Sequence, residues 1–284
     1  MAHDLNRSVI TLACEDRPGI VHAMSGAIVE ASGNITESQQ YFSPDTSRFF
    51  MRIEVEHATD RSLLVSALRP VAERLGGRLD VDQVGRPART LILVSTAPHC
   101  LNALLTRWKQ GTLGIEVPAV VANHPDLEPL ARFYGVPFEH HAVLPETKAW
   151  TEDRIRQVMA EHDIELVVLA RYMQVLSPQL CADLAGRVIN IHHSFLPGFK
   201  GANPYRQAHA RGVKLIGATA HFVTADLDDG PIIAQNVTHV NHAKSVPQLV
   251  ELGRDIESTT LSDAVRLFAE HRILLDGIRT VIFD

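Results

Sequence analysis

The sequence of 284 residues predicts an α/β protein with two domains, a ferredoxin-like βαββαβ domain followed by a doubly wound, mostly parallel sheet. Residues 48–56 alternate apolar and polar side chains, which is typical of an antiparallel strand with one buried face. Residues 90–95, 116–122 and 166–170 are almost wholly apolar, as in parallel strands that helices cover on both faces. Residues 85–89 read Gly-Arg-Pro-Ala-Arg, and this breaker-rich segment predicts a linker between domains 1–84 and 90–284.

In the first domain, turn residues divide the chain into six elements. Apolar residues recur at helical spacing over 20–31, and Ser32-Gly33-Asn34 ends that helix; Gly76-Gly77 ends a second helix over 61–75. The remaining segments, 9–14, 35–42, 48–56 and 78–84, read as strands. The resulting order places both helices on one face of an antiparallel sheet.

In the second domain, strands and helices alternate. Helices are predicted over 100–109, 127–134 and 151–162, further strands over 188–192, 216–223 and 232–240, and a long closing helix over 246–271. In such a sheet the ligand crevice lies outside the carboxyl ends of the strands. We therefore expect the site there.

Composition and charge exclude several classes of protein. The chain is 45% hydrophobic and 21% charged without a membrane-length apolar run, and its net charge of −6 argues against nucleic acid or a membrane as partner. Its three cysteines, Cys14, Cys100 and Cys181, lie far apart, which favours buried thiols in a reducing compartment. The N-terminus lacks the pattern of a signal peptide, so we expect a cytoplasmic protein.

The richest segment is 188–201, a strand that runs into a loop with proline and glycine. The two-residue period of a strand places Asn190 and His192 on one face at the strand's end and directs His193 elsewhere. An amide and an imidazole together suit an acyl carbonyl, because both can stabilise a developing oxyanion and the imidazole can also transfer a proton.

An acidic turn, residues 224–231, follows the strand 216–223 and contains Asp226, Asp228 and Asp229. A carboxylate there could orient His192 and accept a proton from an attacking water. Each of these pieces alone also has a structural interpretation, as a hydrogen-bonded loop residue or a solvated turn. The pairs His140-His141 and His192-His193 are poor metal ligands, because neighbouring strand residues point to opposite faces, so we expect no metal.

Three segments, 190–201, 205–208 and 221–231, resemble the folate-dependent formyltransferase family at matching spacing. The resemblance covers residue 90 to the C-terminus and implies that Asn190, His192 and Asp228 form the catalytic trio. It implies 10-formyltetrahydrofolate as the small-molecule substrate, with no separate cofactor. It also implies contacts to the folate ring from a second set of residues: Met173, Gln174, Val175, Leu176 and the turn that holds Asp226 and Asp229.

That family contains transferases and hydrolases with the same trio, so the acceptor must be decided elsewhere. A glycine-rich loop after the first strand holds the acceptor's phosphate in the ribonucleotide transformylases. Here residues 94–102 contain no glycine, and Pro98 lacks an amide donor, which favours water as the acceptor. Transfer to an unphosphorylated amine such as an amino sugar, or a non-catalytic folate or amino-acid sensor, remain the alternatives.

The start of the chain resembles an ACT domain through five residues, Asp16, Arg17, Pro18, Gly19 and Ile20. This resemblance implies an amino-acid effector at that turn; the alternative is that the domain only supplies contacts in a homo-oligomer, a dimer or tetramer. An ACT domain ahead of this catalytic half is the arrangement of the family's deformylases. The combined resemblance implies hydrolysis to tetrahydrofolate and formate, which serves one-carbon metabolism and purine biosynthesis. In our hypothesis Asp228 positions and deprotonates water, while Asn190 and His192 stabilise the oxyanion.

Overall fold

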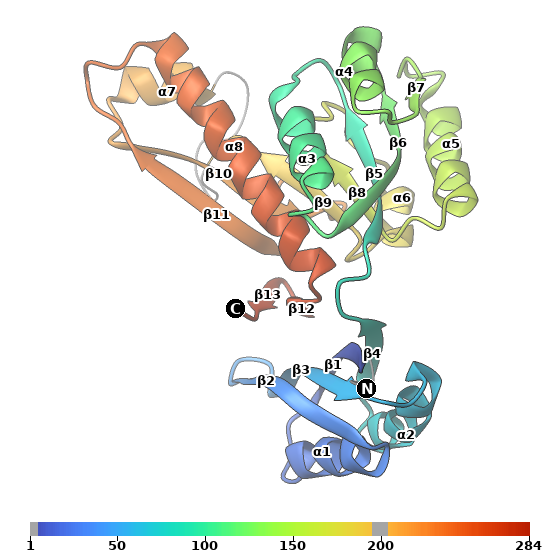
Figure 1. The fold of residues 1–284 in the computed structure, drawn as a ribbon. Coiled ribbons are helices and arrows are strands. Elements are labelled where there is room, and N and C mark those ends of the chain that lie inside the picture. The colour runs from blue at the N-terminus through green and yellow to red at the C-terminus, as the bar shows by residue number, and fades with distance from the viewer. Residues whose placement is uncertain (1–4, 195–203) are drawn as a thin grey trace. The chain divides into compact units, whose positions relative to one another are not determined.

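The computed structural model describes residues 5–194 and 204–284 (Figure 1). The chain divides into two compact units. The first contains the residues up to Arg86 together with Glu270–Asp284, and the second runs from Pro87 to Ala269. The chain therefore passes between the units twice. The sequence interpretation had assigned the C-terminal residues to the second domain, whereas in the structure they pack on the sheet of the first.

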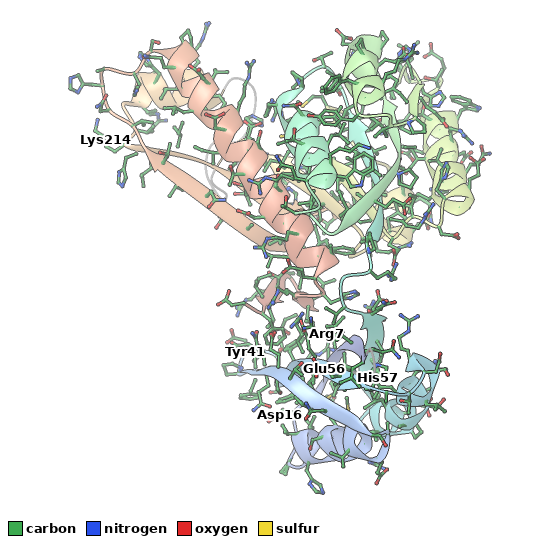
Figure 2. All side chains as sticks on the ribbon, in the orientation of Figure 1. Arg7, Asp16, Tyr41, Glu56, His57 and Lys214 are labelled. Carbon is green, nitrogen blue, oxygen red and sulfur yellow. The ribbon has the colours of Figure 1, made fainter. Side chains whose placement is uncertain are left out.

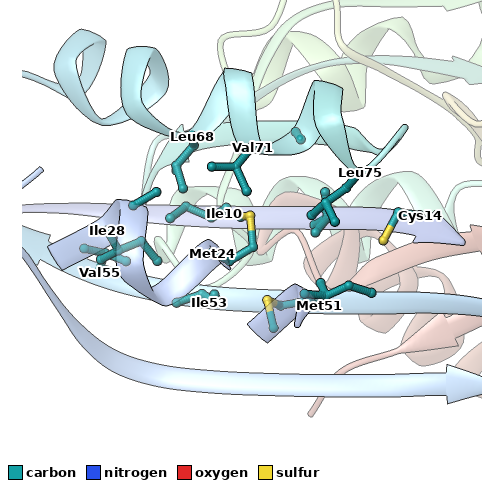
Figure 3. Close-up of a cluster of buried hydrophobic side chains, with 14 of the residues drawn as sticks. Ile10, Cys14, Met24, Ile28, Met51, Ile53, Val55, Leu68, Val71 and Leu75 are labelled. Atoms are coloured by element: carbon teal, nitrogen blue, oxygen red, sulfur yellow. The ribbon is translucent and has the colours of Figure 1, made fainter. Parts of the chain in front are cut away.

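The first unit is a four-stranded antiparallel sheet with two helices on one face. Its elements are β1 (Asn6–Glu15), α1 (Ile20–Glu30), β2 (Gly33–Ser43), β3 (Arg48–His57), α2 (Arg61–Arg74) and β4 (Arg78–Gln83). The strand order is β2-β3-β1-β4, so the expected βαββαβ arrangement is confirmed. Buried side chains from the central strands, among them Ile10 and Ile53, pack against Met24 and Leu68 of the helices (Figure 3).

The second face of this sheet is also covered. A C-terminal hairpin, β12 (Ile273–Asp276) and β13 (Arg279–Ile282), contributes Leu274 to a cluster with Phe50. Arg52, read from the sequence as lying on a polar face, is 2% exposed and forms an ion pair with Glu54 at 2.7 Å. The alternation along β3 therefore separates two buried faces.

The second unit is a seven-stranded sheet with order β11-β10-β9-β8-β5-β6-β7. Five strands are parallel, namely β5 (Ala88–Val94), β6 (Ile115–Ala122), β7 (Phe138–His140), β8 (Leu166–Leu169) and β9 (Val188–His192). Two are antiparallel additions, β10 (Leu215–Phe222) and β11 (Ile232–His239). The helical elements are α3 (His99–Lys109), η1 (Pro125–Leu127), α4 (Glu128–Phe133), α5 (Lys148–Glu161), α6 (Pro178–Asp183), α7 (Pro204–Arg211) and α8 (Val246–Ala269).

The strand order of this sheet reverses beside β5. The chain proceeds from β5 to β6 and β7 on one side, and then returns to place β8 and β9 on the other side of β5. A crevice at the carboxyl ends of the strands next to such a reversal is the expected ligand site. The doubly wound sheet is confirmed.

The long helix α8 lies against β10 and β11 (Figure 1). It buries Leu249, Leu261 and Val265 against the unit, and its other face is polar. Within residues 5–194 and 204–284, no helix combines the length and the apolar character needed to cross a bilayer.

Candidate active site

A cavity of about 700 Å³ opens in the second unit where β8, β9 and β10 end. Its lining comes from the loop after β8, the end of β9, the turn after β10 and one face of α8. Asn190, His192 and Asp228 all line it, although Asp228 lies far along the chain from the other two. The fold thus brings together the three residues that the sequence singled out.

His192 and Asp228 form a hydrogen-bonded pair. The distance from His192 Nδ1 to Asp228 Oδ2 is 3.1 Å, and the His192 ring is 6% exposed. The hydrogen bond from His192 holds the pKa of Asp228 well below its usual range, so its carboxylate is ionised. Because Nδ1 donates to this carboxylate, Nε2 is the reactive nitrogen of His192. Nε2 is buried and has no hydrogen-bond partner among the described residues.

Sequence reasoning missed His221, which orients the amide of Asn190. His221 Nδ1 lies 2.8 Å from the carbonyl oxygen of Phe222, which can only accept, so Nδ1 carries the proton in the neutral ring. Nε2 then accepts from Asn190 Nδ2 at 3.2 Å. The two residues stand directly opposite each other in the antiparallel pair of β9 and β10. Only that register makes His221 part of the site.

The turn that carries Asp228 is held close to β10 by a glycine. A Cβ atom on Gly230 would lie 1.7 Å from the carbonyl oxygen of Phe222, so no larger residue fits there. Asp228 itself has a φ of 56°, a left-handed conformation that aspartate tolerates better than most residues. The backbone of this turn therefore fixes the distance between the carboxylate and His192.

The predicted folate-binding segment forms an apolar part of the cavity. Met173 and Val175 are 61% and 56% exposed, and Leu227, which lines the same cavity, is 67% exposed. Exposed apolar side chains that line one cavity suit a flat aromatic ligand. Gln174 and Leu176 also line it.

The three aspartates of the acidic turn differ in position. Asp226 lines the cavity beside Asp228, whereas Asp229 is exposed and is not among the lining residues. The turn therefore presents two carboxylates to the cavity.

The cavity is also lined by residues that sequence reasoning left aside. The alternation along β9 assigned His193 to the opposite face, but the strand ends at His192 and the two rings lie 4.9 Å apart between centroids. Arg171, at the end of β8, donates to His193 Nδ1 at 2.8 Å. Glu257 of α8 lies behind Arg171 and is 2% exposed. No local sequence pattern connects residues so far apart.

One cluster of three metal-ligating side chains lies among the residues whose structure is described: His99, Cys100 and Glu257. Glu257 already accepts hydrogen bonds from His99 and Tyr205 and forms an ion pair with Arg171. Burial raises the pKa of the Cys100 thiol, so it does not ionise readily as a ligand. These partners disfavour an ion at this position.

Ala97 in the loop after β5 and His99 at the start of α3 also line the cavity. Pro98 directly precedes α3 and lacks the amide proton that would bind a phosphate at the start of that helix. Half-buried His99 and buried Glu257 thus line this part of the cavity.

The predicted effector turn lies in the first unit, between β1 and α1 (Figure 2). Asp16, Arg17, Pro18 and Gly19 are exposed, and Arg17 donates to the carbonyl oxygen of Leu75. Ile20 is 2% exposed and packs in the core, so its side chain is not available to a ligand. Gly19 has a φ of 93°, which lets the chain turn sharply into α1.

A separate cavity of about 870 Å³ in the first unit is lined by the start of β1, by His57 at the end of β3 and by residues of α2 that include Ser62. The lining does not include the effector turn.

Comparison with known proteins defines the class to which this fold and site belong. Residues 88–265 match the formyl transferase family, and residues 6–82 match the ACT domain. The second unit is thus a formyl transferase domain, and the first is an ACT domain completed by the C-terminal hairpin.

Relatives that match over nearly their whole length carry one name. A formyltetrahydrofolate deformylase from Corynebacterium sp. (strain P-1) is 45% identical over 97% of this chain and 98% of its own length. One from Bacillus subtilis (strain 168) is 40% identical over 97% and 93%. The crystal structure of a formyltetrahydrofolate deformylase from Burkholderia mallei superposes with a TM-score of 0.95 at 47% identity, covering 98% of this chain and 100% of that one. The chain belongs to the formyltetrahydrofolate deformylase family.

A more distant neighbour shares only part of the chain. Glycinamide ribonucleotide transformylase 1 from Symbiobacterium toebii has a TM-score of 0.65 at 32% identity and covers 71% of this chain. The likeness to transferases is thus confined to part of the molecule, whereas the likeness to deformylases is complete.

Proposed function

We propose that this protein hydrolyses 10-formyltetrahydrofolate to tetrahydrofolate and formate. The observation that carries the proposal is the His192–Asp228 pair. The buried Nε2 of His192, which has no partner within residues 5–194 and 204–284, lies in a cavity shared with the amide of Asn190. The name of the full-length relatives supports the same substrate and reaction.

In the proposed reaction, the formyl group lies between Asn190 and His192. Asn190 Nδ2 donates one proton to His221, which leaves its second proton for the formyl oxygen. When protonated, His192 donates from Nε2 to the same oxygen, and the Asp228 carboxylate stabilises the positive charge on the ring.

Water attacks the formyl carbon and forms the new C–O bond. Asp228 accepts a hydrogen bond from this water. Because neighbouring histidines keep its pKa low, Asp228 is a weak base and takes the proton only as the C–O bond forms. His192 then gives its Nε2 proton to the folate nitrogen as the C–N bond breaks. The products are the amine of tetrahydrofolate and formic acid, which ionises to formate.

Release of formate without an added amine tests the proposal. Purified protein is mixed with 10-formyltetrahydrofolate alone, and formate is followed with a coupled formate dehydrogenase. Steady formate release is expected. Formate that forms only when an amine is supplied would assign the protein instead as a formyltransferase.

The ACT domain supports a further proposal, that an amino acid regulates the hydrolysis by binding at the exposed part of the Asp16–Ile20 turn. We also propose a homo-oligomer of even symmetry and a cytoplasmic location. The three cysteines are free and buried, which suits a reducing compartment. Formate release measured with and without single amino acids tests the regulation. The mass of the protein in solution tests the homo-oligomer.

A further inference from the structure

His193 has a protonation state that its partner dictates. Arg171 Nη1 lies 2.8 Å from His193 Nδ1, and an arginine can only donate hydrogen bonds. Nδ1 must therefore be the unprotonated acceptor, which leaves the ring proton on Nε2. Burial, the charge of Arg171 and then that of His192 lower the pKa of His193 to about 4.

Arg171 is held in place from behind by Glu257. The distance from Arg171 Nε to Glu257 Oε2 is 3.5 Å, and the Glu257 side chain is 3% exposed. His99 Nε2 and Tyr205 Oη each lie 2.8 Å from a carboxylate oxygen of Glu257. Although burial opposes ionisation, these partners lower the pKa of Glu257, so its negative charge opposes the charge of Arg171.

The backbone also makes room for this cluster. Gly253 lies one turn before Glu257 on α8, and a Cβ atom there would lie 2.0 Å from Tyr205 Oη. Arg171 itself has a φ of 64°, a strained conformation for a residue with a long side chain. The missing side chain of Gly253 thus admits Tyr205 beside Glu257, and the strained backbone of Arg171 lies at the other end of the ion pair.

We propose that Arg171 and Glu257 are positioning residues that fix His193 as a neutral imidazole protonated on Nε2, so that only His192 of the two adjacent rings takes up positive charge. The claim that His192 takes up the positive charge rests on the proposed hydrolysis, in which His192 must carry a proton. Two positive rings with centroids 4.9 Å apart would repel each other, and a neutral His193 avoids this cost.

The charged groups that act on His193 come from four segments of the chain. Arg171 follows β8, His192 ends β9, Asp228 lies in the turn after β10, and Glu257 belongs to α8. The arginine and His192 disfavour a proton on His193, whereas the two carboxylates favour it. Removing Arg171 therefore shifts the balance towards a protonated His193.

Nuclear magnetic resonance of the full chain with ¹³C,¹⁵N-labelled histidine measures the tautomer directly. The signal of His193 is identified by its absence in His193→Gln. In the wild type we expect the neutral Nε2–H tautomer from about pH 5.5 to about pH 9. A proton on Nδ1, or titration near the ordinary value of about 6.5, would overturn the proposal. This measurement needs no catalysis, so it stands even if the protein releases no formate.

The link to His192 is tested by the pH profile of Arg171→Met. We expect kcat to fall by about 10- to 100-fold with little change in KM. A new loss of kcat is also expected as the pH falls through about 6.5, where His193 now becomes protonated.

Arg171→Lys keeps the charge and one donor, and it should restore part of the activity at acid pH. Arg132→Met, at an exposed arginine of α4, is the matched control and should behave as the wild type. If both Arg171 variants keep the wild-type kcat and pH profile, His193 does not act through His192. If Arg171→Met does not fold, the kcat and pH profile of Arg171→Lys are compared with those of the wild type instead.

Discussion

Replacement of Asp228 by asparagine removes one negative charge from the active site and leaves its shape almost unchanged. Asp228 Oδ2 lies 3.1 Å from His192 Nδ1, and its side chain is 18% exposed. An asparagine oxygen can still accept the Nδ1 proton, so the His192 ring can keep its orientation. The charge that stabilises the protonated ring is lost.

The distance between Asp228 and His192 gives the energy that is lost with the charge. Two unit charges 3.1 Å apart interact by about 5 kcal/mol at an effective dielectric constant of about 20. The amide dipole of asparagine and partial exposure to water retain part of this energy. We therefore expect the loss of this charge to raise the barrier by about 3–4 kcal/mol. Because asparagine also cannot take the proton of the attacking water, kcat should fall by at least about 10²- to 10³-fold.

The assay is formate release from 10-formyltetrahydrofolate at saturating substrate, with thermal unfolding as a check on folding. KM should change little, because the charge acts on the transition state. Asp126→Asn, at an exposed aspartate of η1, is the matched control. A folded Asp228→Asn variant whose kcat lies within about tenfold of the wild type would refute the catalytic role of this carboxylate.

Three further predictions concern the amide, the turn and the first unit. Asn190→Ala should lower kcat by about 100-fold or more with folding intact, because one oxyanion donor is lost; near-normal turnover would contradict that role. Gly230→Ala should lower kcat by about 100-fold, because its Cβ would lie 1.7 Å from the carbonyl oxygen of Phe222 and the turn must shift; unchanged kinetics would show that the turn tolerates it. In the first unit, burial opposes charge on His271, but hydrogen bonds to two aspartates outweigh it and raise its pKa to about 9. The charged His271 therefore stabilises the fold below about pH 6.5 by on the order of 2–3 kcal/mol, and this stabilisation is lost as the pH rises through about 9. The Tm difference between the wild type and His271→Gln should shrink over that range. A constant Tm difference would refute the linkage.

Much of the fold was predictable because its signals are local. The turn residues around Gly33 and Gly76 and the apolar runs of the parallel strands indicated the elements, and most observed bounds lie within a few residues. Short elements such as β7 and α6 were not predicted from the sequence, because so few residues show too little periodicity. The C-terminal hairpin was missed for another reason. Alternation in β3 identified one buried face but gave no sign that Phe50 and Arg52 would also be covered.

Part of the candidate site was likewise predictable from local signals, and part depended on the tertiary structure. Strand alternation placed Asn190 and His192 on one face, and family resemblance selected Asp228 among its neighbours. The structure brings that carboxylate to 3.1 Å from His192. His221 could not be assigned, because its place opposite Asn190 depends on how β9 and β10 pair.

The sequence by itself determined most of the strands and helices and the division of the chain near residue 86, and it predicted which motif bears the chemistry. These follow from periodicity and turn chemistry, which act between residues close along the chain. Only the tertiary structure decided that Glu257 of α8 would hold Arg171 and that Arg171 would set the proton of His193. Such contacts join distant segments, and the strand register and helix packing that create them are set by the free energy of the whole fold.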